Sequence, residues 1–324
     1  MRDTDYAYAV ARIRANEGKL LTSAQMASLV DAPTFSDAVA ALRDAGWLDA
    51  AGDDFDVSAA IGAQYERLWQ LLSQSVPASS ELRALTLLND FQNLKAALKC
   101  LLTDSDPTHL YVAPTSLDTE TLTKRVQNHD FDLLPEPFAA CARNAYAAAC
   151  RTESGQSADV IVDAAALQAL SDAANDTDCE LLREVFAFVC DSTNMKIAYR
   201  CARTGKDISF TESAVSACAK LDKRLLCAFA VQGEAALLAH LSGTPYAAGA
   251  ALLQKSTTAF EKWCDDSVTD MVKRAKYVFF GFEPILAYYY AKVAEIKSVR
   301  IILSGKQSGV PVETIKERVR ALYV

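Results

Sequence analysis

The sequence has few of the residues from which metal and catalytic sites are usually built. It contains only three histidines, His109, His129 and His240, and they lie far apart. Nine cysteines are present, but the count is odd and no two form a Cys-x-x-Cys pair. We interpret them as small buried apolar residues in a reducing compartment. The sequence therefore predicts no metal site and no disulfide framework.

An excess of positive charge and a long apolar run are also missing. The formal net charge is -8, whereas a nucleic-acid binder would show a basic surface. The most apolar stretch, residues 277–291, is shorter than a bilayer span and contains Glu283 and Pro284. The first ten residues carry acids where a signal peptide would have its apolar core. We therefore expect a cytoplasmic protein without a transmembrane span or a nucleic-acid partner.

No phosphate-binding loop or catalytic group stands out. Gly205 and Gly305 each precede a lysine, but a P-loop requires another glycine five residues earlier, where this chain has Arg200 and Arg300. These glycines are more typical of left-handed helix ends. No nucleophile and base are visibly paired. The sequence predicts a non-catalytic protein without a cofactor, and an α-helical enzyme with a cryptic site is the alternative.

Helical periodicity is what the sequence has in abundance. Hydrophobic residues make up 51% of the chain, with only 12 glycines and 9 prolines, a composition that favours helix over sheet. Thr22 and Gln25 form a potential capping box, and Thr34 begins a helix that should end near Gly46. A further helix is expected to start at Pro311 and run to residue 323. The predicted fold class is all-α.

A polar signature recurs at intervals of about one hundred residues. "DFQNLKAALK" begins at Asp90 and "DSTNMKIAYR" at Asp191, and the diverged "EIKSVRIILSG" begins at Glu295, so the spacings are 101 and 104 residues. This period exceeds that of ordinary helical solenoids and matches a small domain. It predicts three related helical domains in a pseudo-threefold repeat. The predicted domains cover residues 1–120, 121–220 and 221–324.

Each copy of the signature carries a basic residue on the side opposite its apolar face. These residues are Lys95, Lys196 and Arg300. A recurring contact with a partner would explain the pattern. The commoner explanation is that related helices keep related residues for local packing and solvation.

Two segments resemble the C-subunit family of V-type and A-type ATPases, whose eukaryotic member is named with the letter d. "YAVARIRANEGKLL" (residues 8–21) is similar to the opening of that family, and residues 283–320 are similar to its ending. In that ending, the family's Lys-x-x-Glu-Ile-Lys-x-apolar-Arg-Ile-Ile-Leu stretch is matched at residues 292–303. It is followed by Gly-Lys at 305–306 and Pro-x-Glu at 311–313. The residues just before Glu295, "AKVA", depart from the family pattern.

The resemblance implies a funnel-shaped, all-helical protein with three similar domains. Such a protein sits on the cytoplasmic mouth of the membrane rotor ring, built of proteolipid subunits, and receives the tip of the central shaft, built of D/F-type subunits. It transmits torque for proton or sodium transport and performs no chemistry. It is cytoplasmic and attached peripherally to the membrane through the ring. The alternative from another class is a soluble helical scaffold that binds other partners.

Partner contacts are expected among basic residues of the repeats or of the resembling termini, because charged groups fix the register of an interface. The candidate interface residues are Arg12, Arg14, Lys95, Lys196 and Arg300. Arg12 and Arg14 are two residues apart, so on a helix they point in different directions. One of them could pair internally while the other faces outward.

Overall fold

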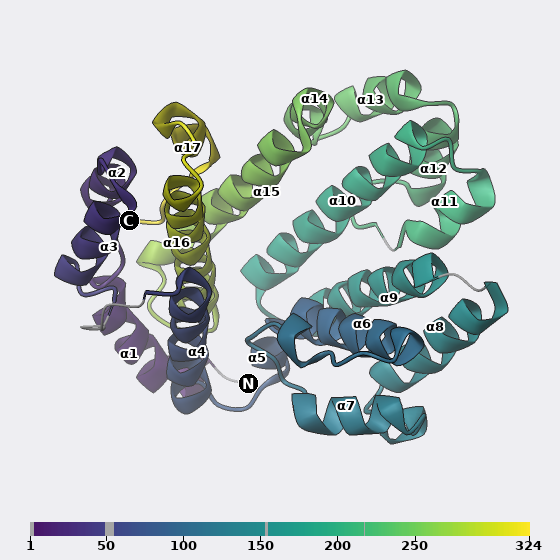
Figure 1. Cartoon of the computed structure of the whole chain (residues 1–324), viewed down its shortest axis with the longest axis horizontal. Coiled ribbons are helices and arrows are strands. Elements are labelled where there is room, and N and C mark those ends of the chain that lie inside the picture. The colour runs from purple at the N-terminus through teal and green to yellow at the C-terminus, as the bar shows by residue number, and fades with distance from the viewer. Residues whose placement is uncertain (1–2, 49–54, 153–154, 217) are drawn as a thin grey trace. The chain divides into compact units, whose positions relative to one another are not determined.

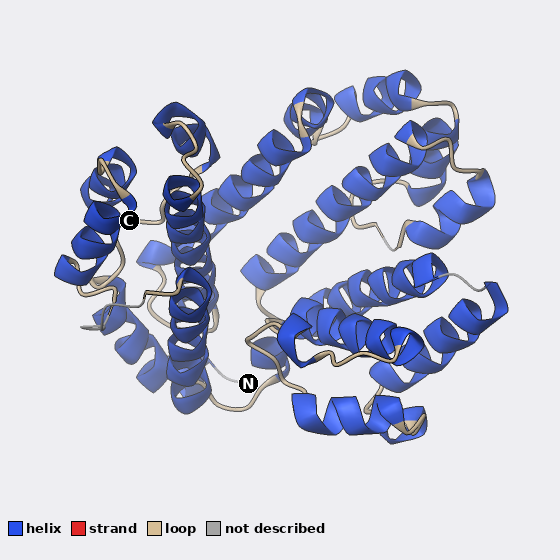
Figure 2. Ribbon diagram, viewed as in Figure 1, coloured by secondary structure: helices blue, strands red, loops and turns tan. Residues whose placement is uncertain are grey.

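The structure is a computed structural model that describes residues 3–48, 55–152, 155–216 and 218–324. Every regular element within these ranges is a helix (Figure 2). The prediction of an all-α fold is therefore confirmed. Within the same ranges, none of the helices combines the length and the apolar character needed to cross a bilayer.

The chain divides into two compact units. The terminal unit combines residues 1–78 with residues 255–324, and the central unit comprises residues 79–254. The division into three consecutive domains stays a prediction, and so do the pseudo-threefold repeat and the funnel shape. The two units are described separately below.

The terminal unit is built around its longest helix, α16 (Glu283–Gln307). Its other elements are η1 (Asp3–Tyr6), α1 (Ala7–Glu17), α2 (Ser23–Asp31), α3 (Phe35–Asp44), α4 (Val57–Ser75), α15 (Thr257–Val272), η4 (Lys273–Tyr277) and α17 (Val312–Arg318). Helices α1, α3, α4, α15 and α17 all contact α16. Its apolar residues Ile296, Val299 and Ile302 pack with Leu42 and Ile61 in one core. Segments from both ends of the sequence therefore share a hydrophobic core.

The central unit is organised around α9 (Gly155–Asp176), which contacts α6 (Leu87–Thr103), α8 (Phe138–Thr152) and α10 (Glu180–Arg203) (Figure 1). Its other elements are α5 (Ser80–Ala84), η2 (Thr108–Leu110), α7 (Thr119–Gln127), η3 (Phe131–Leu133), α11 (Ile208–Ala214), α12 (Lys223–Val231), α13 (Glu234–Ser242) and α14 (Ala247–Lys255). The faces of α8 and α9 are rich in buried alanine. Small side chains let two helix backbones approach closely, which explains why these helices pack side by side.

Several helix ends follow the local signals in the sequence. Thr22 and Gln25 form the expected capping box at the start of α2. Thr34 caps α3, and there the reciprocal partner is Asp37. Gly46 follows the last turn of α3 with a φ of 69°, a backbone angle that glycine adopts readily.

Two local predictions were wrong. The last helix begins at Val312, after Pro311, and it ends at Arg318 instead of running to residue 323, because the segment beyond it is held in a non-helical conformation by polar contacts described below. Gly205 has the expected positive φ, but Gly305 lies inside α16. A Cβ at Gly305 would stand 2.9 Å from the Ile315 side chain, so this glycine serves close packing.

Candidate functional site

The first signature copy ties α6 to a non-helical segment of the central unit. Asp90 is fully buried, and its carboxylate accepts hydrogen bonds from the backbone nitrogens of Ser116 (2.8 Å) and Leu117 (3.3 Å) and from nearby hydroxyl groups. Nearly one helical turn later, the side-chain oxygen of Asn93 accepts a hydrogen bond from the backbone nitrogen of Val112 (2.8 Å). Its side-chain nitrogen donates to the Val112 carbonyl (3.0 Å). The helix therefore holds residues 112–117 through two buried side chains.

The second copy performs the same task on α10. The fully buried Asp191 accepts hydrogen bonds from the backbone nitrogens of Ala219 and Lys220 and from the Tyr246 hydroxyl, each at 2.7 Å. Asn194 accepts a hydrogen bond from the backbone nitrogen of Ser216 at 3.0 Å. Burial and the bond to Asp191 raise the pKa of the Tyr246 hydroxyl, which therefore stays protonated and remains a donor.

The third copy uses related positions on α16 but different partners. Glu295 is 1% exposed, and its carboxylate accepts hydrogen bonds from the backbone nitrogen of Leu21, from Lys292 and from the Trp47 indole nitrogen at 2.7 Å. Ser298 stands where the other copies have asparagine. Its hydroxyl accepts a hydrogen bond from the backbone nitrogen of Arg320 at 3.1 Å.

The asparagine or serine position binds a segment at a similar sequence distance in all three copies. The bonded backbone nitrogen lies 19 residues after Asn93, 22 after Asn194 and 22 after Ser298. A buried backbone N–H without a partner is costly, and the carboxylates and amides supply those partners. The acid and the asparagine or serine of each signature copy therefore serve local structure. We name these three sets of contacts the buried ties.

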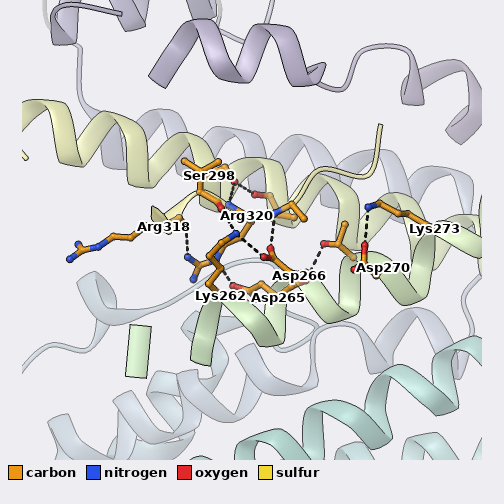
Figure 3. Close-up of polar contacts among 12 residues, drawn as sticks. Lys262, Asp265, Asp266, Asp270, Lys273, Ser298, Arg318 and Arg320 are labelled. Carbon is orange, nitrogen blue, oxygen red and sulfur yellow. Dashed lines mark hydrogen bonds and ion pairs between the residues drawn. The ribbon is translucent and has the colours of Figure 1, made fainter. Parts of the chain in front are cut away.

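A network of charged residues completes the third tie at the C-terminal end of the chain. Figure 3 shows residues of α15 facing Arg320 and Ser298. Lys262 donates to the Val319 carbonyl at 2.6 Å, Arg320 donates to Asp265 at 2.8 Å, and the backbone nitrogen of Ala321 donates to Asp266 at 2.6 Å. These contacts engage the backbone of residues 319–321, which explains why the last predicted helix stops at Arg318.

The two arginines predicted on α1 have different environments. Arg14 bonds both Glu17 carboxylate oxygens at 2.8 Å, and it donates to the backbone carbonyls of Ala275 (2.8 Å) and Val278 (2.7 Å). Burial alone would lower the pKa of Arg14, but the hydrogen bonds and charges of Glu17 and Tyr323 together raise it above its ordinary value, so Arg14 stays charged. The Arg12 guanidinium instead lies 5.8 Å from the ring centre of Tyr8, whose side chain is exposed.

The three basic residues of the signature also lie in different environments. Lys95 forms an ion pair with Asp163 across α6 and α9, and its side chain is only 17% exposed. Lys196 is partly buried on α10, and Arg300 is exposed on α16. Of the five candidates, Arg12, Arg14 and Arg300 lie in the terminal unit, whereas Lys95 and Lys196 lie in the central unit. The structure therefore does not gather the five candidates into one site, and their role as partner contacts stays a prediction.

Most of the cysteines are buried, as the sequence predicts. All nine are free, and six are buried: Cys100, Cys141, Cys179, Cys190, Cys201 and Cys227. Burial raises the pKa of Cys141 and Cys190 to about 12, so these thiols remain protonated near neutral pH. Among the described residues, no three His, Cys, Asp or Glu side chains are placed to hold a metal ion. Cys150, on α8, is exposed, and Cys218 and Cys264 are only partly buried, so these three depart from the expected burial.

Sequence reasoning found the repeated acids but missed most of their partners. The signal that could have identified the ties is an acid and an asparagine three residues apart on the same buried face of an otherwise apolar helix. Such residues are rarely buried unless they are hydrogen-bonded. Trp47, Tyr246 and the α15 acids carry no comparable signal, because only tertiary structure brings them to the signature helices.

Comparison with known proteins identifies the family. The ATP synthase (C/AC39) subunit family matches residues 9–318, which is nearly the whole chain. The chain is 27% identical over 281 residues to the C subunit of the V-type sodium ATPase of Enterococcus hirae, covering 84% of each protein. It is 24% identical over 325 residues to the C subunit of the V-type ATP synthase of Thermus thermophilus, covering 97% of this chain and 98% of that protein.

An archaeal relative extends the similarity to another type of the enzyme. The chain is 23% identical over 355 residues to the C subunit of the A-type ATP synthase of Methanocaldococcus jannaschii, covering 98% of this chain and 86% of that protein. This protein belongs to the ATP synthase (C/AC39) subunit family. The resemblance seen in the two terminal segments is thereby confirmed over the length of the chain.

Proposed function

We propose that this protein is a non-catalytic central-stalk adaptor of a V/A-type rotary ATPase. In that role it links the shaft subunits to the membrane rotor ring and carries torque between them. The family match over residues 9–318 carries the proposal. Its location would be cytoplasmic, with peripheral attachment to the membrane through the ring. The ion moved would be the proton or sodium ion of the motor to which it belongs.

The buried ties support this role physically. A part that carries torque must hold its own segments in fixed positions under load. Tertiary contacts between helices and non-helical segments are vulnerable where backbone groups lack partners. Here buried carboxylates and amides supply those partners in both units, through hydrogen bonds to charged groups that are stronger than neutral ones.

The direct test of the adaptor proposal measures coupling. Membranes that contain the ATPase without this protein are supplemented with the purified chain, and ATP-driven ion pumping is measured per ATP hydrolysed. We expect the chain to bind the membranes and restore pumping. A chain that binds neither the ring nor the shaft, and restores no pumping, would contradict the proposal.

The five basic candidates are tested in the same assay, and the structure separates four of them into two groups. Replacing Arg14 or Lys95 by alanine removes an internal contact and is expected to lower stability. Arg300 is exposed and Arg12 contacts the exposed ring of Tyr8, so replacing either by alanine should leave stability within about 0.5 kcal/mol. A loss of pumping per ATP in the Arg12 or Arg300 variant, at unchanged stability, would identify a partner contact. Normal pumping in all five variants, with Lys196 included, would place the interface elsewhere.

A further inference from the structure

The terminal unit displays three aromatic side chains to solvent in the loop that leads into α16. Tyr277 is 82% exposed, Phe279 is 72% exposed and Phe280 is 57% exposed. Elsewhere in the described chain, the other strongly exposed large apolar groups are aliphatic, with Tyr8 as the one further aromatic residue. We call Tyr277, Phe279 and Phe280 the aromatic loop. Exposed aromatic clusters of this kind mark interaction sites.

Contacts with α1 and with Tyr6 fix the backbone of the aromatic loop near both of its ends. Arg14 of α1 donates to the carbonyls of Ala275 and Val278, one on each side of Tyr277. At the other end of the loop, Phe282 is buried and packs edge-on against Tyr6, with ring centres 5.7 Å apart. A segment fixed in this way loses little conformational entropy when a partner binds. The contacts of Arg14 and Phe282 therefore fix the loop in the conformation that exposes the three rings.

We propose that the aromatic loop docks on the membrane rotor ring, at a surface with an apolar centre and an acidic rim. This inference rests on the proposed adaptor function. Lys273, Arg274 and Lys276 precede the three rings and Glu283 follows them, so the segment 273–283 carries a formal charge of +2 in a chain whose net charge is -8. In many protein interfaces a few aromatic residues at the centre supply most of the binding energy, and polar or charged residues surround them.

The chemistry of the loop favours the ring over other occupants. The ring emerges from the bilayer, and aromatic side chains with basic neighbours are enriched at the boundary between membrane and water. A lipid surface alone would require more charge, because lipid-binding clusters contain about four to eight Lys or Arg residues. Here Lys273 already pairs with Asp270 at 2.9 Å, and the Lys276 ammonium group lies 4.9 Å from the ring centre of Tyr323. A second copy of the chain would bring like-charged rims together, which opposes self-association.

The test compares the full chain with the double variant Phe279→Ser/Phe280→Ser. Binding to the purified ring in lipid nanodiscs, to ring-free nanodiscs of the same lipid and to the purified shaft subunits is measured separately. A matched control removes two exposed leucines from the central unit, Leu133→Ser/Leu225→Ser. Because the replaced side chains are exposed in both double variants, each should keep the helical circular dichroism and the melting temperature of the wild type.

The expected result is an affinity for the ring at least about tenfold weaker in the aromatic variant, with shaft binding unchanged. The leucine control should bind the ring within about twofold of the wild type. Equal ring affinity of wild type and aromatic variant would overturn this inference and leave the adaptor proposal standing. If the aromatic variant lost only its binding to the shaft, or lost binding to ring-free nanodiscs, the ring would not be the partner of the aromatic loop. A wild-type chain that binds neither ring nor shaft would overturn both proposals.

Discussion

Replacing Asp191 by asparagine should destabilise the central unit strongly, although the two side chains have nearly the same size. The carboxylate accepts three hydrogen bonds at 2.7 Å, from two backbone nitrogens and from Tyr246, and it is fully buried. An asparagine would offer one oxygen and would turn an NH₂ group toward donors. Breaking a buried charged contact in this way costs about 3–5 kcal/mol.

A double-mutant cycle with Tyr246 tests this account. Tyr246→Phe alone removes one hydrogen bond to a charged group and should cost about 1.5–3 kcal/mol. In the Asp191→Asn background the same change should cost less, because the hydroxyl no longer faces a full carboxylate. The expected coupling between the two positions is about 1–2 kcal/mol. The matched control is Asp163→Asn, which breaks a more exposed ion pair with Lys95 in the same unit and should cost about 0–1 kcal/mol.

The assay is urea denaturation followed by two probes. Far-ultraviolet circular dichroism reports on helices throughout the chain, whereas fluorescence reports on the terminal unit, because all three tryptophans, Trp47, Trp69 and Trp263, belong to it. The Asp191 variant should shift the circular dichroism transition to lower urea. A loss below about 1 kcal/mol, or no difference from Asp163→Asn, would refute the role assigned to the buried carboxylate.

Three further outcomes follow from the packing and from the thiols. Arg14→Ala should lower the free energy of unfolding by about 2–4 kcal/mol and speed hydrogen exchange in residues 275–280, and unchanged exchange there would show that Arg14 does not fix the loop. Gly305→Val should cost about 1–3 kcal/mol in thermal unfolding, since its side chain meets Ile315, and a neutral result would show that the helix shifts to make room. A thiol reagent at pH 8 should react faster with the exposed Cys150 than with buried thiols such as Cys141, whose pKa burial raises to about 12, and the Cys150→Ser variant should lose the fastest phase.

The sequence predicts the fold class well because helical signals are local. The caps at Thr22 and Thr34 and the positive φ of Gly205 depend on neighbours within a few residues, and the structure has them as predicted. The repeated acids are visible for the same reason, since the signature lies on single helices. What the pattern does not show is which segment each acid binds.

The errors concern contacts between residues far apart in sequence. The pattern at 319–323 is compatible with a helix, but Ser298 and Asp266 accept hydrogen bonds from the backbone N–H groups of Arg320 and Ala321 instead. Gly305 resembles a helix end by its neighbours alone, whereas in the fold Ile315 packs against it. The five basic candidates share only recurrence or resemblance, and Arg14 and Lys95 have internal partners. In the sequence, the exposed aromatic loop is no more than the beginning of an apolar run.

The terminal unit is formed by both ends of the chain, and this arrangement affects how the protein folds during synthesis. The contact between Leu21 and Glu295 joins residues 274 apart, and that between Trp47 and Glu295 joins residues 248 apart. A ribosome adding about 5–20 residues per second needs roughly 10–50 s to travel from residue 78 to the end of α16. Throughout that interval residues 1–78 are already synthesised, but α16 is not yet complete and cannot cover the apolar faces of α1–α4. The nascent chain is therefore expected to depend on holding chaperones until translation is nearly finished.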